Sequence, residues 1–304
     1  MTGRLSHRLV VLGAIPKELR DALEDRYELV DRDTLPKGPA PGFAVAVTTA
    51  VTGIDRHVMD ALPDLRFIAS NGAGLDRIDV AEASRRGIDI CYTPDAVTQD
   101  TSDFAIALVF AISRRLAESD RFVRSGAWKT QRMAPSRRVT GKRLGVIGVG
   151  KIGSAIARKA EALGLDVAYC ARSPKDLKYP FFPSPADLAA WCDYLVLACP
   201  GGEETRHLVN EAVLNRLGPE GYLINISRGS VVDEAALLRA LHGKTIAGAA
   251  LDVFENEPNI ALGFMDLQNV VLTAHIATVT VEARADMASH LRLNIDAFIE
   301  AASA

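Results

Sequence analysis

The sequence has few cysteines and no long apolar segment. These two features argue against a metal-binding protein and against a membrane protein. The four cysteines fall within or beside apolar runs, and none belongs to a C-x-x-C pair. We therefore expect reduced core thiols in a cytoplasmic protein, and no metal site. No apolar run is long enough to span a bilayer, and the run near the N-terminus is too short for a signal peptide. No membrane partner is expected.

The chain also lacks an excess of positive charge. A formal net charge of -3 argues against a general nucleic-acid binder. Hydrophobic residues make up 48% of the chain and charged residues 24%, which is typical of a soluble globular protein. Because 304 residues are too many for one ordinary core, the length indicates two domains.

A glycine-rich turn between a strand and a helix is the clearest motif. Residues 143–147 read as a short buried strand, residues 148–153 are G-V-G-K-I-G, and apolar residues then recur at helical spacing up to Gly164. In such a turn the first glycine allows the bend, the second lets a pyrophosphate approach, and the third packs helix on strand. The helix N-terminus then favours the anion. We predict a dinucleotide site; the alternative is a purely structural turn.

The end of the next strand, residues 166–171, indicates which dinucleotide binds. An NAD site normally has Asp or Glu there to accept the ribose 2′-OH. This chain has Arg172, Ser173 and Lys175 instead, with no carboxylate among them. These groups suit a 2′-phosphate, which predicts NADPH or NADP as cofactor, with NADH used more weakly. The alternative is that Arg172 and Lys175 are only solvated loop charges.

Strands and helices alternate along the whole chain, which predicts an α/β fold with parallel sheets. Residues 8–92 supply one small sheet, and residues 144–274 supply enough strands for a complete Rossmann sheet. A last helix, about 279–301, is predicted to return to the first domain. We expect two Rossmann-like or flavodoxin-like domains, 1–98 plus 282–304 and 99–281, with the active-site cleft between them.

Residues 98–125 are predicted to form one long helix between these domains. Its part 104–112 is apolar on every face, so we expect it to be buried on all sides, between domains or between subunits. The following residues 129–143 carry six basic side chains and no acid. That composition is typical of a solvated loop; the alternative is a region that draws in an anionic substrate.

Three polar residues lie where apolar strands end: Arg228 follows residues 223–227, Glu257 lies just beyond residues 253–254, and His275 ends residues 270–274. Because the carboxyl ends of parallel strands share one edge of a sheet, the three side chains could converge on one ligand. Each alone is more often a surface ion pair or a structural histidine. Together, beside a dinucleotide site, they favour hydride transfer to a carbonyl.

The combined motifs resemble those of the D-isomer-specific 2-hydroxyacid dehydrogenases. The resemblance rests on G-V-G-K-I-G, I-N-I-S-R-G-S-V-V-D-E, G-A-A-L-D-V-F-E-N-E-P and L-T-A-H-I-A-T. T-P-D-A-V-T-Q-D-T-S-D and A-C-P-x-x-E-x-T-R-H are most similar to the NADPH-preferring glyoxylate/hydroxypyruvate and hydroxyphenylpyruvate reductases of that family. The resemblance runs from about residue 70 to the final helix. It implies an NADPH-dependent reductase that converts a small 2-oxo acid into the D-2-hydroxy acid, as a homodimer.

The resemblance also implies roles for individual residues. Arg228 would bind the substrate carboxylate and polarise the 2-oxo group, and His275 would give the carbonyl oxygen its proton as hydride arrives from the nicotinamide. Glu257 would orient the imidazole and favour its protonated form. The substrate carboxylate would also meet backbone N–H groups of Gly72, Ala73 and Gly74. The implied cofactor-binding set is Gly148, Gly150, Lys151, Ile152, Gly153, Arg172, Ser173, Cys199, Pro200, Thr205, Ile226 and Asp252, the last for the nicotinamide carboxamide.

Three departures from the family pattern leave the substrate open. Ala274 stands where the family usually has Pro, Ala277-Thr278 replaces Gly-Ser, and residues 72–74 read G-A-G where the branch tends to have S-V-G. These changes keep the catalytic groups but alter the expected pocket. Two other functions stay open: a dinucleotide-sensing binding protein or corepressor, against which the intact triad argues, and a dehydrogenase of another acid such as formate or phosphite.

Overall fold

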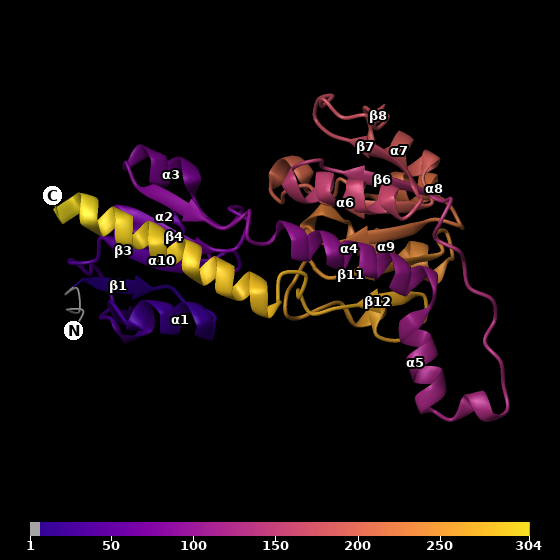
Figure 1. Ribbon diagram of the computed structural model, residues 1–304, viewed down its shortest axis with the longest axis horizontal. Helices are drawn as coiled ribbons and strands as arrows, with labels where there is room; N and C mark the ends of the chain where they lie inside the picture. The colour runs from indigo at the N-terminus through magenta and orange to yellow at the C-terminus, as the bar shows by residue number, and fades with distance from the viewer. Residues whose placement is uncertain (1–6, 304) are drawn as a thin grey trace. The chain divides into compact units, whose positions relative to one another are not determined.

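The computed structural model describes residues 7–303, and the chain divides into two compact units (Figure 1). Unit 1 comprises residues 1–97 and 278–304, and unit 2 comprises residues 98–277. The outermost ends of the predicted first domain, residues 1–6 and 304, lie outside the described residues. Among the described helices, none is long and apolar enough to cross a membrane. Residues 7–303 also contain no cluster of His, Cys, Asp or Glu side chains that could hold a metal ion.

Unit 1 is built on a five-stranded parallel sheet in the order β2-β1-β3-β4-β5, which is the flavodoxin-like order. The strands are β1 (Arg8–Val11), β2 (Glu28–Asp31), β3 (Val45–Thr49), β4 (Phe67–Asn71) and β5 (Asp89–Tyr92). The central strand β1 pairs Leu9 with Leu29 on one side and with Val45 on the other. Its apolar run is buried because helices cover both faces.

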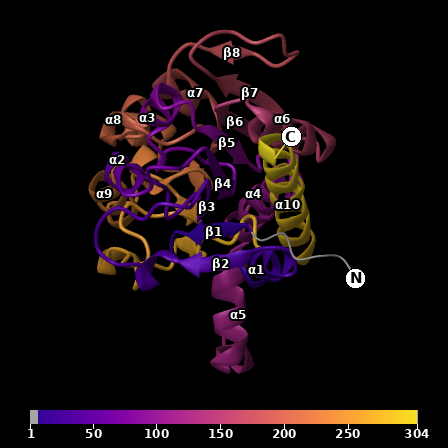
Figure 2. The ribbon, with the colours of Figure 1, turned by 90° about the vertical axis from the view of Figure 1, so that its left-hand side faces the viewer.

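Two helices cover each face of this sheet. Helices α1 (Lys17–Glu24) and α10 (Val281–Ser303) pack on one face, and α2 (Arg56–Asp60) and α3 (Val80–Arg85) on the other. The short helices α2 and α3 begin at Asp55 and Asp79, whose side chains accept a backbone N–H of the first turn. Helix α10 lies along this sheet in Figures 1 and 2. It packs Leu291, Ile295 and Ile299 against the sheet. The predicted return of the last helix to the first domain is therefore confirmed.

Unit 2 contains a seven-stranded parallel sheet in the order β12-β11-β10-β9-β6-β7-β8. The strands are β6 (Arg143–Ile147), β7 (Asp166–Cys170), β8 (Phe181–Phe182), β9 (Tyr194–Leu197), β10 (Tyr222–Asn225), β11 (Gly248–Leu251) and β12 (Val270–Leu272). The chain order reverses between β6 and β9. In open α/β sheets ligands bind outside the carboxyl ends of the strands at such a point. The predicted Rossmann sheet is confirmed.

The helices of unit 2 lie in two layers. One face of the sheet packs against α4 (Thr98–Ser113) and α6 (Lys151–Ala162), the other against α7 (Pro185–Trp191), α8 (Glu211–Leu217) and α9 (Glu234–His242). Helix α5 (Leu116–Arg124) follows α4. Short 3₁₀ turns complete the chain: η1 (Arg32–Thr34) in unit 1, and η2 (Ala127–Lys129), η3 (Glu203–Thr205), η4 (Gly229–Val231) and η5 (Leu262–Phe264) in unit 2.

The prediction of a single helix over residues 98–125 is wrong, because the chain breaks between α4 and α5. Arg115 adopts a left-handed conformation, with φ 54°, and starts α5 in a new direction. Its guanidinium holds Glu118 through two hydrogen bonds, and Ser113 Oγ lies 2.7 Å from Tyr194 Oη. The break involves neither Gly nor Pro, so the sequence carries no signal for it.

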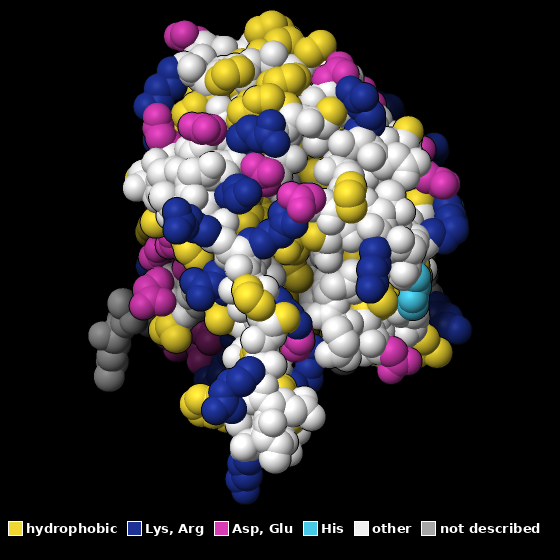
Figure 3. Space-filling model, turned by 90° about the vertical axis from the view of Figure 1, so that its right-hand side faces the viewer, with side chains coloured by type: hydrophobic (Ala, Val, Ile, Leu, Met, Phe, Trp, Pro, Cys, Tyr) yellow, Lys and Arg dark blue, Asp and Glu magenta, His cyan; other side chains and the backbone are white. Residues whose placement is uncertain are grey.

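The apolar stretch 104–112 is not buried on all sides within the described chain. Leu108, Val109 and Ile112 are buried in the core of unit 2, but Ala107 is exposed and Phe110 only partly covered. Helix α5 and the turn η2 project from the unit, and Figure 3 shows apolar and basic side chains on that projection. The surface of α4 and α5 is therefore more apolar than a solvated face requires.

Candidate active site

The glycine-rich turn links β6 to α6 at the point where the strand order reverses. Gly148 has φ +90°, and a Cβ on it would lie 2.7 Å from the backbone of Cys199. A Cβ on Gly153 would lie 1.9 Å from the carbonyl oxygen of Gly148. These two glycines are therefore fixed by close backbone approach, as the motif predicts.

The second glycine leaves room for a ligand. A Cβ on Gly150 would meet nothing within 4 Å. Gly150 also caps α6 without any side-chain hydrogen bond, and Lys151 and Ile152 form the first turn of this helix. The chain thus presents a helix N-terminus beside an open glycine, and that arrangement fits a pyrophosphate.

The predicted phosphate-binding residues lie together after β7. The hydroxyl of Tyr169 donates to the backbone oxygen of Lys175 and accepts its N–H, at 3.0 and 2.8 Å. This contact fixes the loop that carries Arg172 and Ser173. Arg172 is strongly exposed and forms an ion pair of 3.2 Å with Glu204. The loop is open to a 2′-phosphate, which would compete with Glu204 for the guanidinium.

The residues after β9 and β10 line the same edge of the sheet. Thr205 Oγ1 donates to the backbone oxygen of Pro200 at 2.7 Å and so holds the loop that follows Cys199. Burial raises the pKa of the Cys199 thiol to about 11, although hydrogen bonding to its own backbone opposes the shift. The thiol is therefore neutral, and with Ile226 it offers an apolar wall rather than a nucleophile.

Arg228 lies three residues beyond the end of β10. The buried Asn225 side chain donates to the backbone oxygen of Arg228 at 3.0 Å and accepts the backbone N–H of Ser227 at 3.0 Å. The guanidinium in turn donates to the backbone oxygen of Ser227 at 2.8 Å. These contacts fix the turn that carries Arg228 at the carboxyl end of the sheet.

Glu257 and His275 form a hydrogen-bonded pair at the same edge. Glu257 Oε2 lies 2.8 Å from His275 Nδ1, and Oε1 accepts the backbone N–H of Phe254 at 2.9 Å. Burial acts to raise the pKa of Glu257, but the His275 and Phe254 hydrogen bonds and the charges of His275 and Arg228 outweigh it and lower the pKa. Glu257 is therefore ionised near neutral pH and accepts the Nδ1 proton, which leaves Nε2 to face a substrate.

The segment that carries His275 is anchored to Asp252. His275 itself has φ 53°, and its backbone N–H donates to the backbone oxygen of Asp252 at 2.8 Å. Both carboxyl oxygens of Asp252 accept hydrogen bonds from residues 273–277, and the residue is 0% exposed. Contact with a nicotinamide carboxamide would require this segment to shift, so that role stays a prediction.

The glycine-rich turn of unit 1 follows β4. The N–H of Gly72 donates to Thr93 Oγ1 and the N–H of Thr93 donates to the oxygen of Gly72, both at 3.0 Å. The Gly72 amide is therefore engaged within the unit. The predicted contact of Ala73 and Gly74 with a substrate carboxylate stays a prediction.

Within unit 2 the structure joins Glu257 to His275, and the chain adds three residues that sequence reasoning missed. Asn225, Glu204 and Thr93 each touch a predicted site residue through the contacts above. Asn225 could have been found, because it is a polar residue inside the apolar run that precedes Arg228. Glu204 and Thr93 carry no such signal, since their contacts form only in the folded chain.

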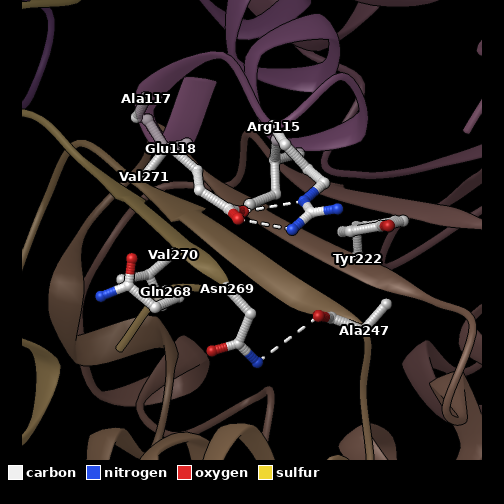
Figure 4. Close-up of a pocket in the computed structure, with 10 residues that line it drawn as sticks. Arg115, Ala117, Glu118, Tyr222, Ala247, Gln268, Asn269, Val270 and Val271 are labelled. Carbon is white, nitrogen blue, oxygen red and sulfur yellow. Dashed lines mark hydrogen bonds and ion pairs between the residues drawn. The ribbon is translucent and has the colours of Figure 1, made fainter. Parts of the chain in front are cut away.

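A separate cavity of about 200 Å³ lies at the amino-terminal edge of the same sheet (Figure 4). Tyr222, Ala247 and Val270 line it beside the ion pair of Arg115 and Glu118. None of the predicted site residues borders it. Because ligands of open α/β sheets bind at the carboxyl edge, the candidate active site is the edge that carries Arg228, Glu257 and His275.

Comparison with known proteins gives the family of this chain. Residues 106–277 match the family model of the D-isomer specific 2-hydroxyacid dehydrogenase, NAD binding domain. A 2-ketogluconate reductase of Gluconobacter oxydans is 42% identical over 92% of this chain and 91% of its own length. A glyoxylate/hydroxypyruvate reductase of Arabidopsis thaliana is 41% identical over the same shares of the two chains.

A solved structure is similar over nearly the whole chain. The NADPH-dependent glyoxylate/hydroxypyruvate reductase of Sinorhizobium meliloti, in complex with NADP and malonate, has a TM-score of 0.91 and 36% identity and covers 98% of this chain and 94% of its own. The fold and the overall similarity to these proteins indicate the same family as the motifs of the glycine-rich turn and the strand ends. The chain belongs to the D-isomer-specific 2-hydroxyacid dehydrogenases.

Proposed function

We propose that this protein uses NADPH to reduce a small 2-oxo acid of the glyoxylate or hydroxypyruvate type to the D-2-hydroxy acid. The observation that carries the proposal is the 2.8 Å hydrogen bond between Glu257 and His275 beside Arg228. A proton donor held by a carboxylate, next to a guanidinium, is what reduction of a carbonyl next to a carboxylate requires. The relatives named above support this substrate class.

Each residue has a distinct task in the proposed reaction. The planar guanidinium of Arg228 binds the substrate carboxylate and polarises the 2-oxo group. His275 Nε2 donates a proton to the carbonyl oxygen, while Glu257 accepts the hydrogen bond from Nδ1 and keeps the ring oriented. Bound NADPH supplies the hydride that the carbonyl carbon takes up. The product is the 2-hydroxy acid, with one hydride and one proton added.

The preference for NADPH rests on the loop after β7. Arg172, Ser173 and Lys175 offer a guanidinium, a hydroxyl and an ammonium group where an NAD enzyme has a carboxylate. All three are exposed in the described structure. The 2′-phosphate would take the place of the Glu204 carboxylate beside Arg172.

We assign the substrate-binding role to unit 1 and the NADP-binding role to unit 2. The amides of Ala73 and Gly74 would add hydrogen bonds to the substrate carboxylate, since the Gly72 amide is held by Thr93. Replacing Thr93 with Val would free the Gly72 amide and loosen the turn. We expect a higher KM for the 2-oxo acid and an unchanged KM for NADPH.

The direct test is steady-state turnover with NADPH and NADH against glyoxylate, hydroxypyruvate, 2-ketogluconate, pyruvate and arylpyruvates. The proposal expects consumption of NADPH with at least one small 2-oxo acid and formation of the D enantiomer of the product. Turnover with none of these acids, together with activity on formate or phosphite, would replace the proposal by oxidation of those acids. NADPH binding without any turnover would favour a dinucleotide-sensing protein.

We further propose that the protein is a cytoplasmic homodimer that pairs through α4 and α5. The cytoplasmic assignment rests on the cysteines, which are all free. Leu116 and Val123 lie seven residues apart on one face of α5 and are 54% and 51% exposed. No residue of α5 is buried within the described chain, so a second copy is the natural cover for this face.

Light scattering tests the dimer. Wild type should have the mass of two chains, and a double variant, Leu116→Lys with Val123→Lys, should have the mass of one. Replacing the exposed Arg124 of the same helix with Lys is the matched control and should leave the mass unchanged. A dimer that survives the double variant would place the contact elsewhere.

A further inference from the structure

Two buried polar side chains lie at the ends of neighbouring strands. Both contact the segments that carry proposed catalytic residues. Asn225 ends β10 and is 1% exposed, and Asp252 follows β11 and is 0% exposed. The strands pair in parallel, and the backbone N–H of Asp252 donates to the backbone oxygen of Asn225 at 3.0 Å. A buried polar group is stable only where hydrogen bonds satisfy it, so the partners of these two side chains define their task.

The described partners of the Asn225 side chain belong to the segment that carries Arg228. Asn225 Oδ1 accepts the backbone N–H and the hydroxyl of Ser227, both at 3.0 Å. Its Nδ2 donates to the backbone oxygen of Arg228 at 3.0 Å. One amide side chain therefore closes the turn from both sides and sets the direction in which the Arg228 side chain leaves the sheet.

The side-chain partners of Asp252 all belong to the segment that carries His275. Oδ1 accepts the hydroxyl of Thr273 at 2.7 Å and the backbone N–H of Ile276 at 2.9 Å. Oδ2 accepts the backbone N–H of Ala277 at 2.9 Å. These donors flank His275 on both sides and hold the bend in which it has φ 53°. The left-handed bend of a non-glycine residue persists only where surrounding contacts fix it.

We propose that Asn225 and Asp252 are positioning residues, which act through Arg228 and His275 respectively and do not touch the substrate. The inference rests on the proposed function for the identity of the reaction, but the contacts that carry it are independent of any ligand. It adds a positioning task for Asp252 beside the predicted contact with the nicotinamide carboxamide. The absence of exposed surface on Asp252 favours the positioning task.

The two tasks predict different kinetics for Asp252→Asn. This change keeps the shape of the side chain but replaces one acceptor oxygen by an NH₂ group, which cannot accept from Ile276 or Ala277. Because small displacements of a proton donor slow catalysis strongly, kcat should fall by on the order of 10- to 100-fold. The KM for the 2-oxo acid and the dissociation constant of NADPH should stay within about threefold. Weaker NADPH binding with unchanged kcat would overturn the proposal and support the carboxamide contact.

Asn225→Asp is the matched variant for the other segment. It keeps the acceptor for Ser227 and loses the donor to the backbone oxygen of Arg228. Since Arg228 binds the substrate carboxylate, KM for the 2-oxo acid should rise about tenfold or more, and NADPH binding should not change. An unchanged KM together with a reduced kcat would contradict a role through Arg228.

Amide hydrogen exchange tests the positioning of His275 without relying on turnover. In the ligand-free wild type, the N–H groups of Ile276 and Ala277 should exchange slowly, and Asp252→Asn should accelerate both about tenfold or more. The amide of Leu223, in the middle of β10, is the internal control and should not change. Equal exchange in the two proteins would overturn the inference even if the wild type is an active reductase. Accelerated exchange in Asp252→Asn, combined with a wild type that reduces no 2-oxo acid, would instead refute only the proposed function.

Thr273→Val is the second variant for the same test if Asp252→Asn does not fold. It removes only the hydroxyl that donates to Oδ1, and the backbone donors remain. The same change in exchange and in kcat is expected at a smaller size, about threefold to tenfold. A Thr273→Val protein with wild-type kcat and wild-type exchange at Ile276 would contradict the proposal.

Discussion

His275 Nδ1 and Glu257 Oε2 lie 2.8 Å apart, and the second oxygen of this carboxylate is held by the backbone N–H of Phe254. The carboxylate is thereby fixed in place and kept ionised, since its pKa lies below its ordinary value despite burial. A carboxylate in this state accepts the Nδ1 proton of its histidine partner and fixes the orientation of the ring. The pair is therefore suited to deliver a proton from Nε2 to a carbonyl oxygen.

Glu257→Gln should change the pH dependence of the reduction. Glutamine keeps the shape of the side chain but carries no charge, so the protonated imidazole loses its stabilisation. The reductive rate should then decline at a lower pH than in the wild type, while the rate at acid pH persists. The direction of this shift follows from the reaction, because reduction needs the protonated imidazole ring and oxidation needs the neutral ring. Rates of reduction across pH measure this shift.

A neighbouring glutamate supplies the control for that experiment. Glu255 lies two residues away, but its carboxylate contacts His207 Nε2 at 3.0 Å rather than His275. Glu255→Gln should therefore leave the pH profile of reduction where it is in the wild type. Superimposable profiles for Glu257→Gln and the wild type would remove Glu257 from the mechanism.

Arg228→Lys should weaken use of every 2-oxo acid. Lysine keeps the charge but cannot form the two parallel hydrogen bonds of a guanidinium with a carboxylate. The loss should be about 2–4 kcal/mol of transition-state stabilisation, or roughly 30- to 1000-fold in kcat/KM. Binding of NADPH, followed by fluorescence, should barely change. Retention of kcat/KM within a few-fold for all acids would show that Arg228 does not hold the substrate.

Two glycines of the turn after β6 should respond differently to alanine. A Cβ on Gly153 would collide with the carbonyl oxygen of Gly148, whereas a Cβ on Gly150 would meet nothing within 4 Å. Gly153→Ala should therefore destabilise the ligand-free protein by about 1–3 kcal/mol. Gly150→Ala should fold with wild-type stability but bind NADPH more weakly, because its methyl group occupies the space left for the pyrophosphate. Thermal unfolding and NADPH titration separate the two effects; equal unfolding temperatures for all three proteins would be inconsistent with this packing.

Arg172→Asp should move cofactor preference from NADPH toward NADH. The aspartate would repel the 2′-phosphate and supply the acceptor that a ribose 2′-OH needs. Hydrogen bonds to charged groups contribute about 1.5–3 kcal/mol, so the wild type should prefer NADPH roughly tenfold or more. Glu204→Gln, which only removes the ion-pair partner of Arg172, should keep or strengthen that preference. The measurement is the Michaelis constant of each protein for NADPH and for NADH. If the ratio of the two constants is the same in Arg172→Asp as in the wild type, Arg172 is only a solvated charge.

Local sequence patterns predicted the strands and the residues that follow them. Arg228, Glu257 and His275 could be placed on one edge because each ends or follows a buried parallel strand, and that rule needs no knowledge of contacts. The glycine spacing predicted the turn at 148–153 for the same reason, since it encodes backbone geometry. Strands β2 and β8 were not predicted, because β2 has only two apolar residues between Glu28 and Asp31 and β8 has only two residues in all.

Features that depend on long-range contacts could not be predicted from the sequence. The break at Arg115 depends on Glu118 and on the neighbouring Ser113–Tyr194 contact, and nothing in the apolar run of α4 announces it. The engagement of the Gly72 amide by Thr93 likewise joins residues 21 positions apart. Fine geometry of this kind decides which amides and carbonyls remain for a ligand.

The most direct test of the account compares wild type with His275→Gln in NADPH-dependent reduction of glyoxylate and hydroxypyruvate. Glutamine cannot provide the proton that Nε2 delivers, so turnover should fall by on the order of 100-fold or more at every pH. NADPH should still bind with wild-type affinity, since His275 is not part of the glycine-rich turn. Turnover of His275→Gln within a few-fold of an active wild type would contradict the proposed mechanism.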